Sequence, residues 1–438
     1  MPQRYPGYLT TLGGGNEPGR AMLFSQPAGQ LTLTLRAGKF VLAADGAAPD
    51  VPPDQHFCAA LDHWVSAVGS RTSPTSEATA INGGWLLFLG YELAGQIEPT
   101  VTLRHANTHP VAIAKRVQRV ISLDRRGVCE VAAESDSLLD LEGLRRDIDL
   151  VRRLPYPKID ARITPVENLG IDYRDAVSRA REYIAAGEVY QVNLARQWHA
   201  PAQRDFAPAL FESLCSANPA PFAALARFDQ FDIVSSSPER LVAVTGRDIS
   251  TRPIAGTRPR LHHQAADKRM IDELRSNQKE QAEHVMLVDL ERNDLGRLCV
   301  AGTVRVDEAM TIETYERVHH IVSNIRGTLR DSVGPGAVIE ALFPGGTITG
   351  CPKIRCMQII DELEQRPRGA YTGSLGYLTC DGRMDLNILI RTLVVDHQKL
   401  TLSAGAGIVA DSDPQREYDE CAAKAAALHN AIQNACVS

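Results

Sequence analysis

Two pairs of glutamates, each three residues apart, are the first candidates for chemistry in this sequence. Glu280 and Glu283 lie in residues 278–287, whose spacing predicts an amphipathic helix, and Glu417 and Glu420 repeat the arrangement near the C-terminus. Residues three apart share one helical face, where like charges repel in water. One such pair alone is typical of a solvated surface helix. Four carboxylates meeting across two helices would need a cation, and a set of oxygen ligands suits Mg²⁺.

A predicted strand at 188–197 carries amide side chains on one of its faces. The alternation places Gln191, Asn193 and Gln197 on one side and Tyr190, Val192 and Leu194 on the other. Such a face either meets solvent or lines a polar cavity, and the alternation alone favours solvent because half-exposed strands are common. The helix predicted before it, at 173–184, ends near Gly187, which suits the position after a helix.

Two glycine-rich segments would let a ligand approach the backbone. Residues 343–353 lead into a predicted helix at 354–364 with Pro352 near its first turn, where exposed N–H groups are receptive to an anion. Residues 403–408 are predicted to form a turn after a strand, which serves either close approach of a ligand or a tight turn alone.

An arginine stands within a predicted apolar strand at 389–394. Arg391 needs a partner in such surroundings. A carboxylate ligand held by two parallel hydrogen bonds would provide one.

The elements that must position these residues fall into two parts. Up to about residue 150 the pattern is strand-like, with short alternating runs such as 31–35. Prolines between 155 and 165 predict a stiff connector, beyond which helices and strands alternate. We therefore expect an α+β fold with an N-terminal sheet-rich region at 1–155 and a catalytic region at 165–438.

The composition excludes several classes of protein. The 438 residues are 44% hydrophobic and 23% charged, and a net charge of -6 without a basic block argues against a nucleic-acid partner. The longest apolar run, 85–89, predicts a buried strand and is too short to cross a membrane, and the N-terminus has no apolar signal core. Nine scattered cysteines without a C-x-x-C motif suit a reducing compartment, so we expect a cytoplasmic protein with no membrane partner.

Five segments, taken in order, resemble those of the chorismate-utilising family, which includes the anthranilate, aminodeoxychorismate, isochorismate and salicylate synthases. They are Ser235–Arg240 (SSSPER), Arg252–Arg260 (RPIAGTRPR), Asp289–Arg297 (DLERNDLGR), Phe343–Lys353 (FPGGTITGCPK) and Gly405–Asp411 (GAGIVAD). The resemblance covers the chain from about residue 165 and, more weakly, the part before it. It implies a large fold of two packed antiparallel sheets with peripheral helices and an active site in the core.

The resemblance also implies a magnesium site. Glu283 and Glu420 would ligate Mg²⁺, and Glu280 and Glu417 would hold its waters. The metal would bind the ring carboxylate of chorismate, with Lys424 beside it.

Further residues match the family's substrate-binding and catalytic positions. Tyr371, Arg391 and the backbone at Gly405 and Gly407 would hold the enolpyruvyl carboxylate, and Thr347 would lie near the ring. Glu239 matches the general acid that protonates the departing 4-hydroxyl, and His320 the active-site histidine. The Pro-Ile-Ala-Gly-Thr motif adds Ala255 and Thr257 to the catalytic set and Gly256 to the substrate-binding set.

Two positions and two segments distinguish the reactions of the family. Gln191 stands where isochorismate and salicylate synthases carry a lysine base; an amide cannot activate water, so ammonia is the better nucleophile. Ala255 is typical of anthranilate synthases, although a subgroup of aminodeoxychorismate synthases also carries alanine there, and no covalent intermediate can form on it. Residues 343–350 and 373–377 instead favour aminodeoxychorismate synthase. The tryptophan feedback element is missing, with 22–25 in its place.

The sequence therefore predicts amination of chorismate at C4, through non-covalent 2-amino-2-deoxyisochorismate, to 4-amino-4-deoxychorismate. Formation of anthranilate with loss of pyruvate stays open as an alternative. A non-catalytic scaffold that docks a glutaminase is an alternative from another class. No Gly-x-Cys-x-Gly nucleophile elbow occurs in the chain, so we expect ammonia to come from a separate glutamine amidotransferase subunit in a heterodimer.

Overall fold

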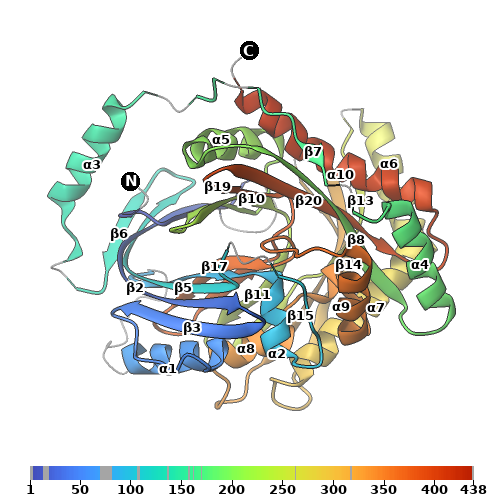
Figure 1. The fold of residues 1–438 in the computed structure, drawn as a ribbon, viewed down its shortest axis with the longest axis horizontal. Helices are drawn as coiled ribbons and strands as arrows, with labels where there is room; N and C mark the ends of the chain where they lie inside the picture. Colours follow the sequence, from blue (N-terminus) through green and yellow to red (C-terminus); the bar gives the residue numbers. More distant parts are fainter. Residues whose placement is uncertain are drawn as a thin grey trace.

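The computed structural model describes residues 3–12, 19–69, 81–105, 109–135, 138–155, 158–160, 162–168, 170–261, 263–315 and 318–436. Figure 1 shows a sheet-rich body with helices on its outer faces, in which β10, β19 and β20 form a layer facing β2, β5 and β17. Every pairing between the named strands is antiparallel. The predicted α+β class with packed antiparallel layers is confirmed.

The N-terminal strands form most of one layer. They are β1 (Gly7–Thr10), β2 (Arg20–Arg36), β3 (Lys39–Gly46), β4 (Gly84–Leu89), β5 (Ala112–Asp124) and β6 (Cys129–Ala133). All six residues of β4 are buried, as its apolar run predicted. β1 pairs with β9 (Phe222–Arg227) and β4 with β17 (Ser374–Thr379), so backbone hydrogen bonds join this region to the later part of the chain.

The later strands complete both layers. One run is β9, β10 (Phe231–Ser237), β19 (Thr392–Asp396), β20 (Lys399–Ile408) and β8 (Gln191–Pro201), with the short β7 (Val166–Glu167) and β16 (Gly350–Cys351) beside β8. The other contains β17, β18 (Met384–Asn387), β11 (Arg240–Thr245), β12 (Asp248–Thr251), β15 (Val318–Thr328), β13 (Ile254–Pro259) and β14 (Arg305–Thr314).

Three apolar cores hold the layers and helices together. Between the layers, residues such as Phe24, Phe88 and Phe231 belong to one buried cluster, in which Phe88 and Phe231 meet edge to face. α4 (Tyr173–Ala185), α9 (Lys353–Glu364) and α10 (Pro414–Ala435) cover β8 and β20, while α5 (Ala207–Ala217) packs on β9, β10 and α10. α1 (Phe57–Gly69) and α8 (Pro335–Leu342) pack together below the other layer, and α7 (Gln278–Gly296) reaches β13 and β15. The remaining helices are α2 (Ala94–Ile97), α3 (Leu141–Arg153) and α6 (Gln264–Ser276).

The helices predicted at 173–184, 278–287 and 354–364 are confirmed, and Gly187 follows α4 with a φ of 77°. The strand-like interpretation of the first 150 residues is wrong at α1 and α3. In α1 the buried residues Phe57, Leu61 and Trp64 recur at helical spacing, a signal that the short apolar runs obscured.

Two predictions near the C-terminus also need correction. Residues 403–408 are not a turn but the second half of β20, paired along its length with β8. The predicted strand at 389–394 begins only at Thr392, because Arg391 has a φ of 51°, which bends the chain just before β19.

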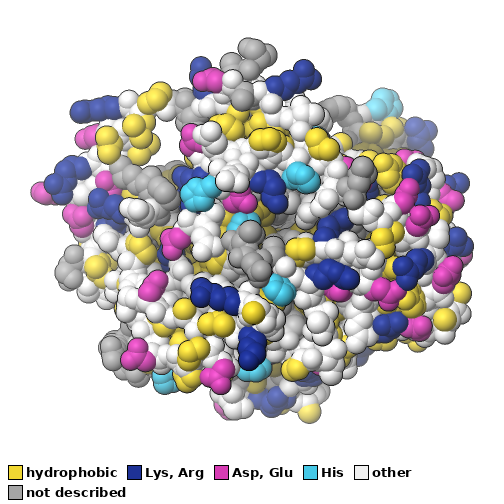
Figure 2. All heavy atoms as spheres, in the orientation of Figure 1, with side chains coloured by type: hydrophobic (Ala, Val, Ile, Leu, Met, Phe, Trp, Pro, Cys, Tyr) yellow, Lys and Arg dark blue, Asp and Glu magenta, His cyan; other side chains and the backbone are white. Residues whose placement is uncertain are grey.

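The face in Figure 2 carries basic and acidic side chains in mixed positions, with apolar ones between them. This matches the small net charge of the sequence. Among the helices that the structure describes, none combines the length and apolarity that crossing a bilayer requires.

Candidate active site

A cavity of about 220 Å³ lies where several strands and loops meet. It is lined by Asn193, Pro238, Glu239, Ile254, Gly256, Thr257, His320, Thr347, Ile348, Tyr371, Ile390, Arg391, Ser403, Ala404, Gly405, Lys424 and Leu428. These residues come from β8, β13, β15, β20, α10, the turn between β10 and β11, the 3₁₀ turn η4 (Gly346–Ile348), the loop between α9 and β17 and the loop before β19. Segments more than 200 residues apart in the sequence thus enclose one chamber.

Glu239 is the buried acid of this cavity. It follows β10 and is only 6% exposed, and its Oε1 has no hydrogen-bond partner. Burial raises the pKa of Glu239 to about 7, and the negative charge of Glu291 adds to the rise. The Thr347 hydroxyl lies near enough to oppose that shift, although it completes no hydrogen bond. A carboxyl with this pKa can hold a proton at neutral pH and release it to a leaving group.

His320 lies beside the same cavity as a neutral imidazole. It is 2% exposed, and its Nδ1 lies 2.9 Å from the Thr257 hydroxyl. Burial lowers the pKa of His320 to about 4, with the charge of Arg391 adding to the effect. The β-bulge at Gly256, with a φ of 62°, lets the strand approach Glu280: a Cβ at this position would lie 2.5 Å from its carboxylate.

Tyr371 and Arg391 occupy the end of the cavity formed by β20 and the loop before β19. The Tyr371 hydroxyl reaches Gly405 so closely that a Cβ on that glycine would lie 2.8 Å from the oxygen. Arg391 donates from Nη1 to Asn218 Oδ1 at 2.5 Å. Arg391, for which the sequence indicated no partner within the chain, therefore has one in Asn218.

The amide face of β8 points inward, so the preference for solvent was wrong. Gln191 is 6% exposed and Asn193 9%, and the apolar face is buried as well, with Val192 and Leu194 at most 1% exposed; Tyr190, which precedes β8, is 70% exposed. Asn193 lines the cavity and its Oδ1 has no hydrogen-bond partner. Gln191 lies next to the cavity rather than in its lining, with its amide directly over Gly407.

The glutamates predicted to hold a cation lie on α7 and α10. Glu280 accepts from Arg258 at 2.8 Å, and its Oε2 is buried without a hydrogen-bond partner; Glu420 pairs with Lys424 at 2.8 Å. Carboxylate oxygens, one of them buried and unsatisfied, fit Mg²⁺ in their chemistry. Within the part of the chain that the structure describes, however, no three such side chains gather closely enough to hold a metal.

Lys424 connects α10 to the cavity. Its ammonium donates to the Gly405 carbonyl at 3.2 Å and keeps the pairing with Glu420 at a side-chain exposure of 47%. The helix therefore places one cation at the rim of the chamber, over the strand that carries Gly405.

The structure brings most of the predicted residues together. Nine line the cavity: Glu239, His320, Thr257, Tyr371, Arg391, Thr347, Gly256, Gly405 and Lys424. Outside its lining stand Gln191, Ala255, Gly407, Glu280, Glu283, Glu417 and Glu420. The segment 343–353 contributes Thr347 and Ile348, whereas the first turn of α9, predicted to receive an anion, does not line the cavity.

Sequence reasoning missed Asn193 and Ser403 as cavity residues. Both are buried polar side chains on neighbouring strands β8 and β20. The amide alternation around Asn193 was the available signal. Ser403 begins the glycine-rich segment 403–408, but its side chain was not singled out because its direction depends on the pairing of its strand.

Comparison with known proteins agrees with this architecture. The chain is 42% identical to an anthranilate synthase component I-like protein of Synechocystis over 367 residues (83% of this chain, 75% of that protein). It is 36% identical to an aminodeoxychorismate synthase of Streptomyces griseus over 452 residues (98% of this chain, 61% of that protein). The crystal structure of anthranilate synthase component I from Streptococcus pneumoniae superposes with a TM-score of 0.78 at 29% identity, covering 95% of this chain and 93% of that one.

Several relatives are considerably longer than the part that matches. The match spans less than two thirds of the Streptomyces protein and little more than half of several others. The family model for chorismate binding enzymes, in contrast, matches residues 21–430, almost the whole chain. The chain therefore belongs to the chorismate binding enzyme family.

Proposed function

We propose that this protein aminates chorismate at C4 with ammonia and forms 4-amino-4-deoxychorismate. The observation that carries the proposal is a buried carboxyl, Glu239, with a pKa of about 7, in a chamber it shares with a neutral His320. Displacement of an allylic hydroxyl needs a proton donor for the leaving group, and Glu239 supplies it. The relatives support this reaction in part, because both anthranilate and aminodeoxychorismate synthases are among them.

The nucleophile in this proposal is ammonia rather than water. The amide of Gln191 cannot remove a proton from water at neutral pH, and the buried His320, with a pKa of about 4, is a neutral imidazole in the same chamber. Ammonia adds at C2 while the 4-hydroxyl leaves as water with the proton of Glu239. A second ammonia then attacks C4, and the amine at C2 leaves as ammonia.

Binding of the substrate falls to the cavity's charged and polar groups. Tyr371, Arg391 and the backbone at Gly405 would hold the enolpyruvyl carboxylate, and Thr347 would lie near the ring. Glu283 and Glu420 would ligate Mg²⁺, and Glu280 and Glu417 would hold its waters. The metal, when bound, supplies electrostatic stabilisation of the ring carboxylate.

Ammonia would be delivered by a separate glutamine amidotransferase subunit. The chain has no Gly-x-Cys-x-Gly elbow of its own. Free ammonium at alkaline pH should replace that subunit in a direct assay.

The test is product analysis after incubation of the purified protein with chorismate, Mg²⁺ and excess ammonium, with and without an added aminodeoxychorismate lyase. Lyase-dependent 4-aminobenzoate is the expected result. Unchanged chorismate in both arms would exclude an ammonia-dependent synthase and leave the scaffold alternative.

The second candidate is formation of anthranilate with loss of pyruvate. Ala255, next to the bulge at Gly256, favours it, as do the relatives named anthranilate synthase. Both reactions share the C2 adduct and differ only in its fate. Fluorescent anthranilate that appears without lyase would replace the first candidate by the second.

A further inference from the structure

One edge of β8 passes the cavity without a neighbouring strand. On its other edge β8 pairs with β20 from Val192 to Pro201. On this edge, β16 pairs only with Gln191 and Val192, and β7 only with Trp198 and His199. The residues between them, which include the cavity residue Asn193, need other partners for their backbone groups.

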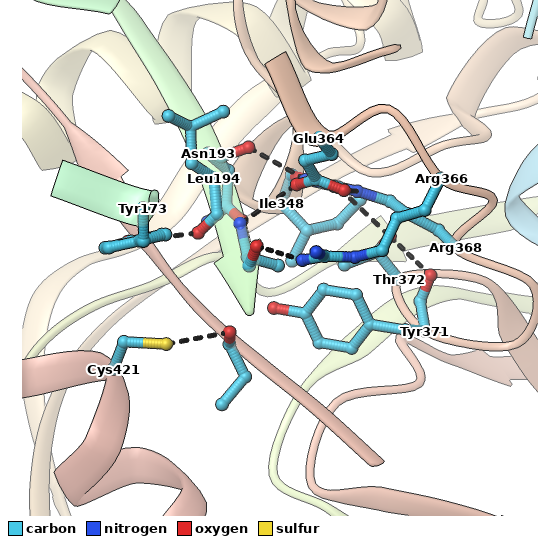
Figure 3. Close-up of polar contacts among 12 residues, drawn as sticks. Tyr173, Asn193, Leu194, Ile348, Glu364, Arg366, Arg368, Tyr371, Thr372 and Cys421 are labelled. Carbon is cyan, nitrogen blue, oxygen red and sulfur yellow. Dashed lines mark hydrogen bonds and ion pairs between the residues drawn. The ribbon is translucent and has the colours of Figure 1, made fainter. Parts of the chain in front are cut away.

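The Asn193 N–H donates to the Thr349 carbonyl at 2.9 Å, and side chains at the end of α9 and just after it provide further partners, as Figure 3 shows. Glu364 accepts from the Ala195 N–H at 2.9 Å, and Arg366 donates to the Ala195 carbonyl. Arg368 donates to the Asn193 carbonyl at 2.8 Å. Three charged side chains thus satisfy both backbone groups of Ala195 and the carbonyl of Asn193, while backbone groups of Thr349 and Asn168 pair with the Asn193 N–H and the Gln197 carbonyl.

Arg368 is the centre of this arrangement. Its guanidinium meets both oxygens of Glu364, at 2.6 and 3.0 Å, and the two side chains are only 2% and 3% exposed. It also lies over the rings of Tyr91 and Tyr371, at 4.9 and 5.6 Å from their centroids. A charge so fully buried requires multiple partners, and here one carboxylate and two rings supply them.

The remaining donors of Arg368 reach two other walls of the cavity. Nη1 donates to the Ile348 carbonyl and to the Thr372 hydroxyl, each at 3.2 Å. Thr372 has a φ of 61°, an uncommon conformation for a β-branched residue that persists only where its surroundings fix it. This bend directly follows Tyr371, whose hydroxyl reaches Gly405.

We propose that Arg368, held by Glu364, is the positioning residue that fixes three walls of the cavity relative to one another. Through carbonyls and a hydroxyl it holds β8 at Asn193, η4 at Ile348 and the bend after Tyr371. The proposal rests on the proposed function, since the walls it holds are those assigned to chorismate. Arg368 itself does not line the cavity.

The planar fork of arginine is what the arrangement requires. A lysine at this position keeps the charge and can pair with Glu364, but it cannot direct donors to three separate walls. If Arg368 only neutralised Glu364, lysine would restore stability and turnover together. If it positions the walls, lysine restores stability alone.

The experiment compares Arg368→Ala, Arg368→Lys and Arg196→Lys in the full chain, with chorismate, Mg²⁺ and ammonium. Arg196 is the matched control: it lies on β8, is 5% exposed, pairs with Glu167 and stacks on Tyr418, but does not line the cavity. Consumption of chorismate is measured rather than product identity, together with thermal unfolding. We expect Arg368→Ala to lower the unfolding temperature and Arg368→Lys to recover most of it. Arg368→Lys should still have a kcat reduced about 10- to 100-fold with KM changed much less, and Arg196→Lys should keep the wild-type kcat.

Wild-type kcat in Arg368→Lys, or an equal loss of kcat in Arg196→Lys, would overturn the positioning role. The proposed use of chorismate would still stand in that case, because the wild-type protein consumes it. A wild-type protein that consumes no chorismate would remove the proposed function and with it the role in catalysis. If Arg368→Lys does not fold, Thr372→Val removes one of its partners at nearly constant shape. Unchanged kcat in that variant would also overturn the proposal.

Discussion

On one side of the cavity, Glu239 in the turn between β10 and β11 and His320 on β15 are almost fully buried. On the other side, Lys424 reaches in from α10 with half of its side chain exposed and shares the solvent-exposed Glu420. The first side is fixed by backbone pairing and carries shifted pKa values. On the second side, the described carboxylates are not gathered around one point. The proposed proton donor is thus already buried in place, whereas the proposed cation site would depend on side chains of two helices.

The largest effect should come from the side of the cavity that carries Lys424 and the proposed metal ligands, called the open side below. We predict that Glu283→Gln abolishes Mg²⁺-dependent turnover, because an amide removes one anionic oxygen from the set that must neutralise the cation. The measurement is chorismate consumption during a Mg²⁺ titration, with the exposed Glu212→Gln on α5 as control. A variant with the wild-type Mg²⁺ dependence would refute the metal role of Glu283.

On the buried side, Glu239→Gln should reduce kcat by about 10²- to 10⁴-fold, because the leaving hydroxyl loses its proton donor. Chorismate should still bind, since the amide has nearly the same shape as the carboxyl. Stopped-flow turnover and an equilibrium binding assay measure the two effects separately. Normal turnover in this variant would remove Glu239 as the general acid.

The pH dependence sharpens the contrast between the two sides. The pKa of Glu239 is raised to about 7, so the proton it must donate is present below pH 7 and is lost above it. We predict that kcat/KM, expressed per concentration of NH₃, falls about tenfold per pH unit above 7. A descending limb near pH 4.5, the ordinary pKa range of a glutamate, would show that burial does not raise the pKa of Glu239.

The smallest effect is expected at Lys424. Its replacement by glutamine removes a half-exposed ion pair and one hydrogen bond to Gly405, which should raise KM for chorismate about two- to fivefold and leave kcat nearly unchanged. Steady-state kinetics with Lys399→Gln, an exposed lysine on β20 outside the cavity, provide the control. A large fall in kcat would mean that the open side is as preorganised as the buried one.

The sequence alone determined several of the local elements and the identity of most cavity residues. Helical spacing placed Glu280 with Glu283 and Glu417 with Glu420 on common helix faces, and the apolar run at 85–89 predicted the buried β4. The motifs named Glu239, Thr257 and His320, which the fold brings to one chamber. These features depend on neighbours within a few residues, or on residue identity, and are therefore visible in the chain itself.

Only the tertiary structure decided which faces are buried and which charges have partners. The amide side chain of Asn193 on β8 is inside because distant segments of the chain, including Glu239, His320 and Lys424, enclose the chamber that it lines. The edges of the strand are completed by β20 on one side and partly by Glu364, Arg366 and Arg368 on the other. Arg368 and Asn193 are 175 residues apart in sequence. The same alternation would occur on a solvated strand, since burial depends on what packs against a face rather than on the face itself.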